Sequence, residues 1–149
     1  MAMNSLRRTL DWFSRPGSLP LILLIYLLLR VAVLAIPLTQ FSDGSWYMAR
    51  ASNLAWGEGY TEDGVPTAFW PPGLPMVLSV LFRIFSPSPV VAQIFNLVCS
   101  MGTAWLTLDL GRRLFQSEAT GRIALLLLAI YPNNIGYLPL VATEVFYTM

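Results

Sequence analysis

The chain has 149 residues, of which 56% are hydrophobic and 11% charged, whereas soluble domains carry roughly 25% charged residues. It contains no histidine and one cysteine, which excludes a histidine base, a Ser-His-Asp triad, a Cys/His zinc site and an intrachain disulfide. Its net charge of +1 argues against a nucleic-acid surface. Composition therefore predicts a membrane protein whose proton chemistry depends on carboxylates.

The first apolar segment runs over residues 19–37 and is long enough to cross a hydrocarbon core of roughly 30 Å. It starts too late and runs too long for a cleaved signal peptide, so we expect an anchor. Its one charged residue is Arg30. Two interpretations remain open: Arg30 snorkels to an interface, or it faces other helices and pairs with an anionic partner.

The proline-led segment 71–85 is shorter, and as a helix it would extend only about 22 Å. If it spanned the membrane, three arginines would lie inside and four outside. If it lies on the outer surface, six lie inside and two outside, which the positive-inside tendency favours. The inside set is Arg7, Arg8, Arg15, Arg112, Arg113 and Arg122, and the outside set is Arg50 and Arg83.

The expected fold is an all-α membrane protein with three transmembrane helices and two surface-lying juxtamembrane helices, part of a larger polytopic fold. We expect a bacterial inner (plasma) membrane location with a cytoplasmic N-terminus. The predicted segments are a cytoplasmic N-terminus (1–18), transmembrane helix 1 (19–38), an outer loop (39–88) with helices 43–56 and 71–85, transmembrane helix 2 (89–111), a cytoplasmic loop (112–121), transmembrane helix 3 (122–140), and an outer loop with the start of a fourth helix (141–149).

Two acidic residues follow predicted spans closely: Asp43 after the first and Glu144 after the third. Both would lie at the outer bilayer surface, where they could converge. A carboxylate at a helix N-terminus is held ionised, as a base or a divalent-cation ligand requires. The alternatives are that Asp43 is a helix N-cap and that Glu144 is a solvated residue at a helix end.

Several short motifs occur in a characteristic order along the chain. They are Asp43-x-x-x-Tyr47, Ala51-x-Asn53-Leu54-x-x-Gly57-x-Gly59-Tyr60, Pro71-Pro72-Gly73-x-Pro75, Gly111-Arg112-Arg113-Leu114-Phe115, Tyr131-Pro132-Asn133 and Thr143-Glu144. Together they resemble the polytopic C-superfamily (GT-C) glycosyltransferases, in particular the protein O-mannosyltransferases (family 39) and the aminoarabinose transferases (family 83). Many relatives have an acidic pair in the first loop, where this chain has Asp43-Gly44.

The resemblance implies an enzyme that moves a sugar from a polyprenyl-phosphate donor to an acceptor hydroxyl of a glycan, lipid or protein on the outer face. Asp43 is then the base or acceptor-orienting group, with a divalent cation in some members. Glu144 is a second polar ligand of acceptor or metal. The substrate-binding residues expected from this resemblance are Tyr47, Arg50, Tyr60, Trp70 and Arg83, with either arginine meeting the carrier phosphate.

An alternative function is a non-enzymatic integral membrane subunit for interaction or assembly. The polar residues Gln93, Asn96 and Asp109 within the second predicted span could hold helices together. Since the family members are several hundred residues long, we expect this chain to be the N-terminal part of such an enzyme and to be inactive alone.

Overall fold

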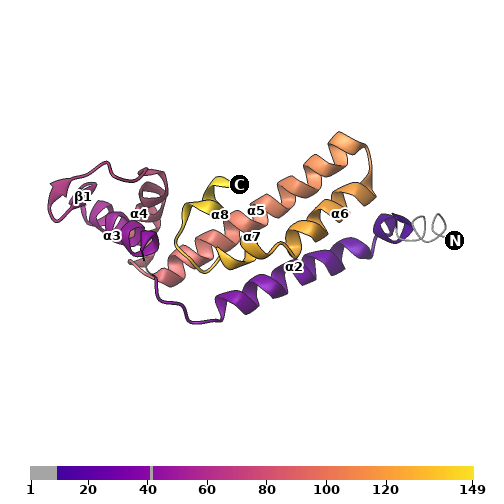
Figure 1. The fold of residues 1–149 in the computed structure, drawn as a ribbon, viewed down its shortest axis with the longest axis horizontal. Coiled ribbons are helices and arrows are strands. Elements are labelled where there is room, and N and C mark those ends of the chain that lie inside the picture. Colours follow the sequence, from indigo (N-terminus) through magenta and orange to yellow (C-terminus); the bar gives the residue numbers. More distant parts are fainter. Residues whose placement is uncertain (1–9, 41) are drawn as a thin grey trace.

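A computed structural model describes residues 10–40 and 42–149, which are mostly helical with little strand (Figure 1). The mainly helical fold predicted from composition is therefore confirmed, and the expectations for Arg7 and Arg8 lie outside the described residues. Residues 10–14 are helical. The elements that follow are α2 (Ser18–Leu34), α3 (Asp43–Trp56), β1 (Thr61–Glu62), β2 (Val65–Pro66), α4 (Gly73–Phe85), α5 (Pro89–Phe115), α6 (Glu118–Ala129), α7 (Pro132–Gly136) and α8 (Thr143–Tyr147).

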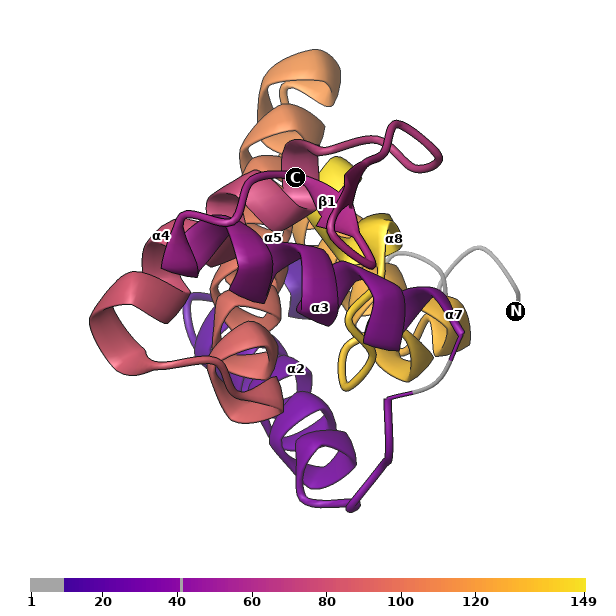
Figure 2. The same cartoon turned by 90° about the vertical axis from the view of Figure 1, so that its left-hand side faces the viewer.

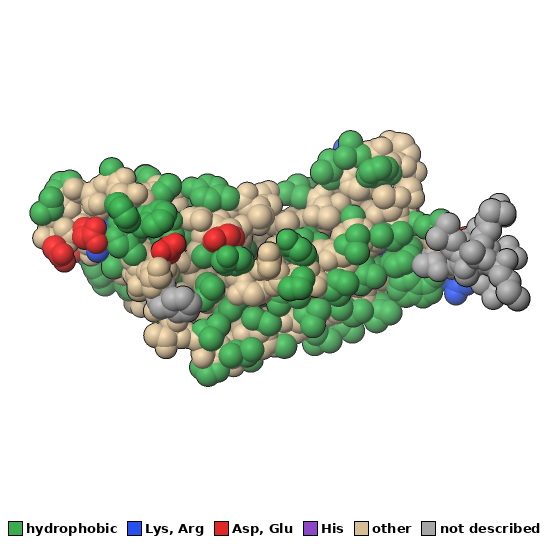
Figure 3. All heavy atoms as spheres, in the orientation of Figure 1, with side chains coloured by type: hydrophobic (Ala, Val, Ile, Leu, Met, Phe, Trp, Pro, Cys, Tyr) green, Lys and Arg blue, Asp and Glu red, His purple; other side chains and the backbone are tan. Residues whose placement is uncertain are grey.

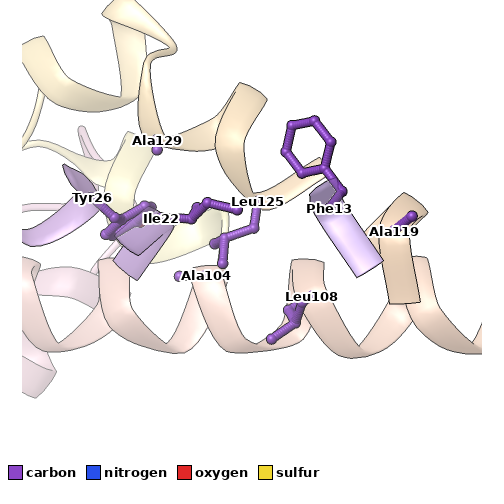
Figure 4. Close-up of a cluster of buried hydrophobic side chains, with 8 residues drawn as sticks. All are labelled: Phe13, Ile22, Tyr26, Ala104, Leu108, Ala119, Leu125 and Ala129. Carbon is purple, nitrogen blue, oxygen red and sulfur yellow. The ribbon is translucent and has the colours of Figure 1, made fainter. Parts of the chain in front are cut away.

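Helices α2, α5 and α6 run along the long axis of the molecule (Figure 1). The turn between α5 and α6 is short because the two helices approach closely at Gly111 and Gly121, where a Cβ on Gly111 would lie 2.9 Å from the Gly121 Cα. Side chains from these three helices, together with Phe13 from the preceding helical residues 10–14, form the core between them (Figure 4). This cluster consists of Phe13, Ile22, Tyr26, Ala104, Leu108, Ala119, Leu125 and Ala129.

Helix α3 runs across one end of this bundle, with α4 packed against it (Figure 2). Its buried residues Tyr47, Ala51 and Ala55 recur every four positions and so lie on one helix face. Those of α4, Leu74, Leu78 and Phe82, follow the same spacing. The two faces form one hydrophobic cluster. Helices therefore occupy both loop segments that the sequence predicted, although α4 begins at Gly73, after the Pro71-Pro72 pair.

Among the described residues, one helix, α5, is long and apolar enough to cross a membrane. Helix α2 is a shorter apolar helix of 17 residues, which corresponds to about 26 Å, and it ends at Leu34 instead of residue 38. Helix α5 continues to Phe115, beyond the predicted end at residue 111. The bounds predicted for the loop over 112–121 are accordingly wrong, because only Gln116 and Ser117 separate α5 from α6.

The continuous helix predicted over 122–140 is also wrong. Helix α6 ends at Ala129, and Tyr131 adopts an extended conformation (φ −70°, ψ 113°) before Pro132, which starts α7. A proline disfavours helical geometry in the residue before it and cannot donate a backbone hydrogen bond. The apolar run is therefore interrupted, and residues 137–142 are not part of a helix.

Arg30 lies at this interruption and is fully buried. Its guanidinium donates to Ser100 Oγ (2.7 Å), to the Tyr26 carbonyl (3.2 Å) and to Asn134 Oδ1. It also donates to the last carbonyls of α6, on Leu128 and Ala129, at 3.4 and 3.3 Å. Arg30 therefore faces other helices, as one interpretation held, but these five acceptors are neutral, so the expected anionic partner is wrong.

The outer faces of the long helices carry exposed apolar side chains. Green hydrophobic spheres extend along the molecule, whereas the visible red acidic groups gather at the end where α3 lies (Figure 3). Contiguous apolar surface of this kind marks a protein or membrane contact. The residues with at least 40% exposure on α2 and α5 include Leu21, Leu24, Leu28, Val31, Val90, Ile94, Val98, Trp105, Leu110 and Leu114.

Candidate functional site

The non-helical segment 137–142 connects α7 to α8 and carries Glu144 to its position. Asn96 of α5 is buried and donates to the carbonyls of Leu138 (3.0 Å) and Leu140 (2.8 Å). Gln93 donates to the Pro139 carbonyl at 3.1 Å. Irregular backbone needs such partners wherever water is excluded. The polar residues of α5 thus hold a loop of the same chain.

Gln40 fastens the same segment to the start of α3. Its amide donates to the Pro139 carbonyl (2.9 Å), and its Oε1 accepts from the Val141 N–H (2.8 Å). A Cβ on Gly44 would lie 2.8 Å from Gln40 Oε1 and 3.3 Å from the Val141 carbonyl oxygen. Glycine therefore permits this close approach, and a larger residue at position 44 would require Gln40 to shift.

A cavity of about 220 Å³ opens beside this contact, between the start of α3 and the start of α8. We call it the acid cavity. Its lining residues are Gln40, Ser42, Asp43, Gly44, Tyr137, Leu140, Val141, Ala142 and Glu144. Asp43 and Glu144, the two acids singled out from the sequence, therefore line the same cavity although they lie far apart in the chain.

Both carboxylates are exposed. Asp43 is the first residue of α3 and the N-cap position belongs to Ser42, so the interpretation of Asp43 as the N-cap is wrong. Asp43 Oδ1 accepts from Ser42 Oγ at 2.9 Å. Glu144 lies in the first turn of α8 and has no hydrogen-bond or ion-pair partner within residues 10–40 and 42–149. Both acids are therefore accessible to a ligand.

Tyr47 is buried behind these acids, one helical turn after Asp43. Burial raises the pKa of its phenol, and the negative charges of Asp43 and Glu144 raise this pKa further, against an opposing hydrogen bond with the Thr143 side chain. The phenol therefore stays protonated at neutral pH and remains available as a hydrogen-bond donor.

The donor set of the acid cavity suits only certain cations. No group of three or more His, Cys, Asp or Glu side chains gathers in the part of the chain that the structure describes. Two carboxylates and a hydroxyl do not suit zinc, which prefers nitrogen and sulfur. They do fit Mg²⁺, which often binds one or two carboxylates and completes its shell with water and substrate phosphate. Asp43 and Glu144 would hold such an ion.

Tyr60 and Trp70 lie outside the acid cavity, in an aromatic cluster beside it. The Tyr60 hydroxyl donates to the Trp70 carbonyl at 2.9 Å, and the Trp70 ring lies 6.4 Å from that of Tyr47. Both residues, with Phe69, line an open pocket of about 320 Å³. The Tyr47 ring therefore packs against this aromatic cluster.

Of the two arginines expected to meet a carrier phosphate, Arg83 is hydrogen-bonded within the loop, whereas Nε and one Nη of Arg50 are buried without a hydrogen-bond partner among the described residues. The Arg50 side chain is 9% exposed and lies 3.6 Å from Glu62, with its guanidinium 5.1 Å from the Trp46 ring centroid. Arg83 donates to the carbonyls of Leu54 and Ala55 at 3.1 Å, where α3 ends and a cation is favourable. Arg50 therefore contacts the β1–β2 hairpin through Glu62, and Arg83 links α4 to the end of α3.

A second cavity of about 200 Å³ adjoins the first, and we call it the tyrosine cavity. Its lining residues are Tyr131, Asn133, Asn134, Tyr137, Glu144, Val145 and Thr148. Tyr131 and Asn133 of the motif Tyr131-Pro132-Asn133 line this cavity, although the sequence predicted a spanning helix over these positions. The available signal was Pro132, since a proline inside an apolar run predicts an interruption.

No known protein family, curated protein or solved structure matches this chain.

Proposed function

We propose that this chain forms the N-terminal, outer-face acid site of a polytopic GT-C glycosyltransferase, which transfers a sugar from a polyprenyl-phosphate donor to an acceptor hydroxyl. The observation that carries the proposal is the acid cavity, because Asp43 and Glu144 line it together. Paired acidic groups at an accessible cavity are suited to accepting a hydroxyl proton. A divalent cation shared by the two acids is compatible with the same arrangement.

In the proposed reaction, the acceptor oxygen attacks the anomeric carbon of the donor sugar. The bond between that carbon and the phosphate oxygen breaks, and polyprenyl phosphate leaves with the electron pair. Asp43 takes the hydroxyl proton, and Glu144 accepts a hydrogen bond that orients the acceptor.

The proposed membrane arrangement has three crossings, α2, α5 and the interrupted segment that contains α6 and α7, with the N-terminus cytoplasmic and the acid cavity on the outer side of a bacterial inner membrane. The length of α5 and the exposed apolar faces of α2 and α5 support it. A tilted or locally thinned bilayer accommodates the shorter α2. In this arrangement α3 and α4, which lie across the end of the bundle, rest on the outer surface.

The alternative of an assembly subunit is based in part on polar residues of α5 that could hold helices together. Gln93 and Asn96 donate to backbone carbonyls of segment 137–142. Asp109 pairs with Arg113 at 2.7 Å, four residues on. Because these groups already have partners within the chain, the observations favour the enzyme.

The test is transfer of a radiolabelled sugar from polyprenyl-phosphate sugar donors, measured in membranes that contain the gene product carrying these residues. Asp43→Asn keeps the shape and removes the base, so we expect the initial rate to fall about 10²- to 10⁴-fold. Glu144→Gln should raise the KM for the acceptor.

The matched control is Asp63→Asn, the same substitution in the turn of the hairpin. Asp63 has φ 50°, a conformation that asparagine tolerates, so its rate should equal that of the unsubstituted protein. A rate for Asp43→Asn within twofold of this control would refute the role of Asp43 as the base.

A further inference from the structure

The tyrosine cavity and the acid cavity share two lining residues, Tyr137 and Glu144. Glu144 therefore stands between them, with Asp43 on one side and Tyr131 on the other. A ligand held in the tyrosine cavity would contact Glu144 directly. A hydroxyl of that ligand beside Glu144 would then face the acid cavity, which Asp43 also lines.

The side chains of the tyrosine cavity are those that recognise a sugar ring. Tyr131 and Tyr137 are 52% and 37% exposed, and exposed aromatic rings offer an apolar face with a polar edge. The C–H face of a pyranose packs against such a ring. Asn133 and Asn134 supply donors and acceptors together, which matches hydroxyl groups that also do both.

Size and charge restrict the ligand further. Pockets for drug-sized ligands occupy roughly 300–1,000 Å³, so a cavity of about 200 Å³ suits a single ring. Its described lining contains the Glu144 carboxylate and no arginine. A carboxylate without a cation disfavours a ligand that carries a phosphate. The lining thus selects an uncharged ring over the phosphate-linked ring of the donor.

Arg30 holds Asn134, one of the residues that line the tyrosine cavity, in position. Its guanidinium donates to Asn134 Oδ1, which leaves the Asn134 amide group as the donor available to a ligand. The same guanidinium holds the Leu128 and Ala129 carbonyls, directly before the segment that carries Tyr131. The most deeply buried charge in the described chain is thus a positioning residue for the tyrosine cavity.

We propose that the tyrosine cavity binds one uncharged pyranose ring of a carbohydrate acceptor, packed on Tyr131 and Tyr137 and hydrogen-bonded by Asn133, Asn134 and Glu144. This inference rests on the proposed function, in which a hydroxyl reacts in the acid cavity. The acceptor ring presents that hydroxyl past Glu144 to Asp43. The acceptor is therefore a glycan or glycolipid.

The test uses the purified chain in detergent micelles and saturation-transfer NMR. The probes are the methyl glycosides of glucose, galactose, mannose and N-acetylglucosamine, each compared with the corresponding sugar 1-phosphate. At least one methyl glycoside should bind, and its 1-phosphate should bind at least fivefold more weakly. Tyr131→Ala should weaken glycoside binding about five- to tenfold, whereas Tyr131→Phe, which keeps the ring, should retain it.

Phe69→Ala is the control, because it removes an aromatic ring that is 74% exposed in the other aromatic pocket. Glycoside binding should not change in this variant. The inference is overturned if no methyl glycoside binds, if the 1-phosphate binds more tightly, or if Phe69→Ala weakens binding as much as Tyr131→Ala.

Asp43→Asn separates this inference from the proposed function. Asp43 lines only the acid cavity, so the variant should bind the glycoside normally and lose transfer. Normal transfer in Asp43→Asn with binding that depends on Tyr131 would refute the proposed function alone. Loss of transfer in Asp43→Asn with binding indifferent to Tyr131 would refute the subsite alone.

Discussion

Arg30→Met tests the interpretation that a buried arginine holds together the interrupted end of α6. Methionine has a similar length and favours helices, so the substitution removes the donors with little change in shape. Ser100 Oγ keeps its 2.7 Å contact with the Tyr26 hydroxyl, and the Leu128 carbonyl still accepts from the Tyr131 N–H at 3.3 Å.

Two acceptors lose the only donor they have in the described part of the chain: the Ala129 carbonyl and Asn134 Oδ1. Each unsatisfied buried acceptor costs about 1–3 kcal/mol. Asn134 is only half-buried and rehydrates in part, so the free energy of unfolding should fall by about 2–4 kcal/mol. The opposing effect is the desolvation of the guanidinium, which methionine avoids.

The assay is unfolding by SDS titration in mixed micelles, followed by fluorescence of the five tryptophans. The control is Arg113→Met, which removes the same charge from a side chain that is 78% exposed and should change the free energy of unfolding by less than about 0.5 kcal/mol. If Arg30→Met is as stable as the unsubstituted protein or more so, desolvation outweighs the hydrogen bonds and the reasoning fails.

Three further substitutions test the close contacts and the charged turn. Gly44→Ala places a Cβ 2.8 Å from the carboxamide oxygen that anchors segment 137–142, so thermal unfolding should show a loss of about 1 kcal/mol; Gly136→Ala, with nothing within 4 Å, should show none. Gly121→Val brings a Cβ 2.8 Å from a backbone carbonyl of α5 and should destabilise the helical hairpin by about 1–3 kcal/mol or more, and unchanged stability would contradict the tight crossing. The Arg112 hydrogen bond lowers the pKa of Glu118, so its stabilising effect is present above the ordinary carboxyl pKa and disappears as pH falls through the lowered value. Glu118→Gln should therefore reduce the loss of stability between neutral and acidic pH, and an unchanged pH profile would contradict the ion pair.

Several properties of this protein follow from local sequence alone. The low charge content and long apolar runs predict helices and a membrane setting, because both depend on the hydropathy of consecutive residues. The helix over 43–56 was predictable from its apolar spacing and from the glycine at its end: Gly57 has φ 84°, which glycine adopts without strain.

The predictions that proved wrong concern positions where contacts between distant residues outweigh the local preference for helix. Hydropathy favoured one continuous helix over 122–140. The chain instead breaks at Pro132, and Arg30, about a hundred positions earlier, donates to the carbonyls of Leu128 and Ala129 that the break leaves at the end of α6. Apart from Tyr26, the neutral partners of Arg30 lie on three other helices, α5, α6 and α7, and could not be inferred from its own neighbours.

The acid cavity and the tyrosine cavity likewise depend in part on local sequence and in part on contacts between distant residues. Their chemical groups were visible as a list of acids, tyrosines and amides, since residue types suffice to name possible chemistry. Whether Asp43 and Glu144 border one cavity depends on Gln40, Gln93 and Asn96, whose amides hold the segment between them. Such contacts join positions far apart in the chain, and only the packed structure brings them within hydrogen-bonding distance.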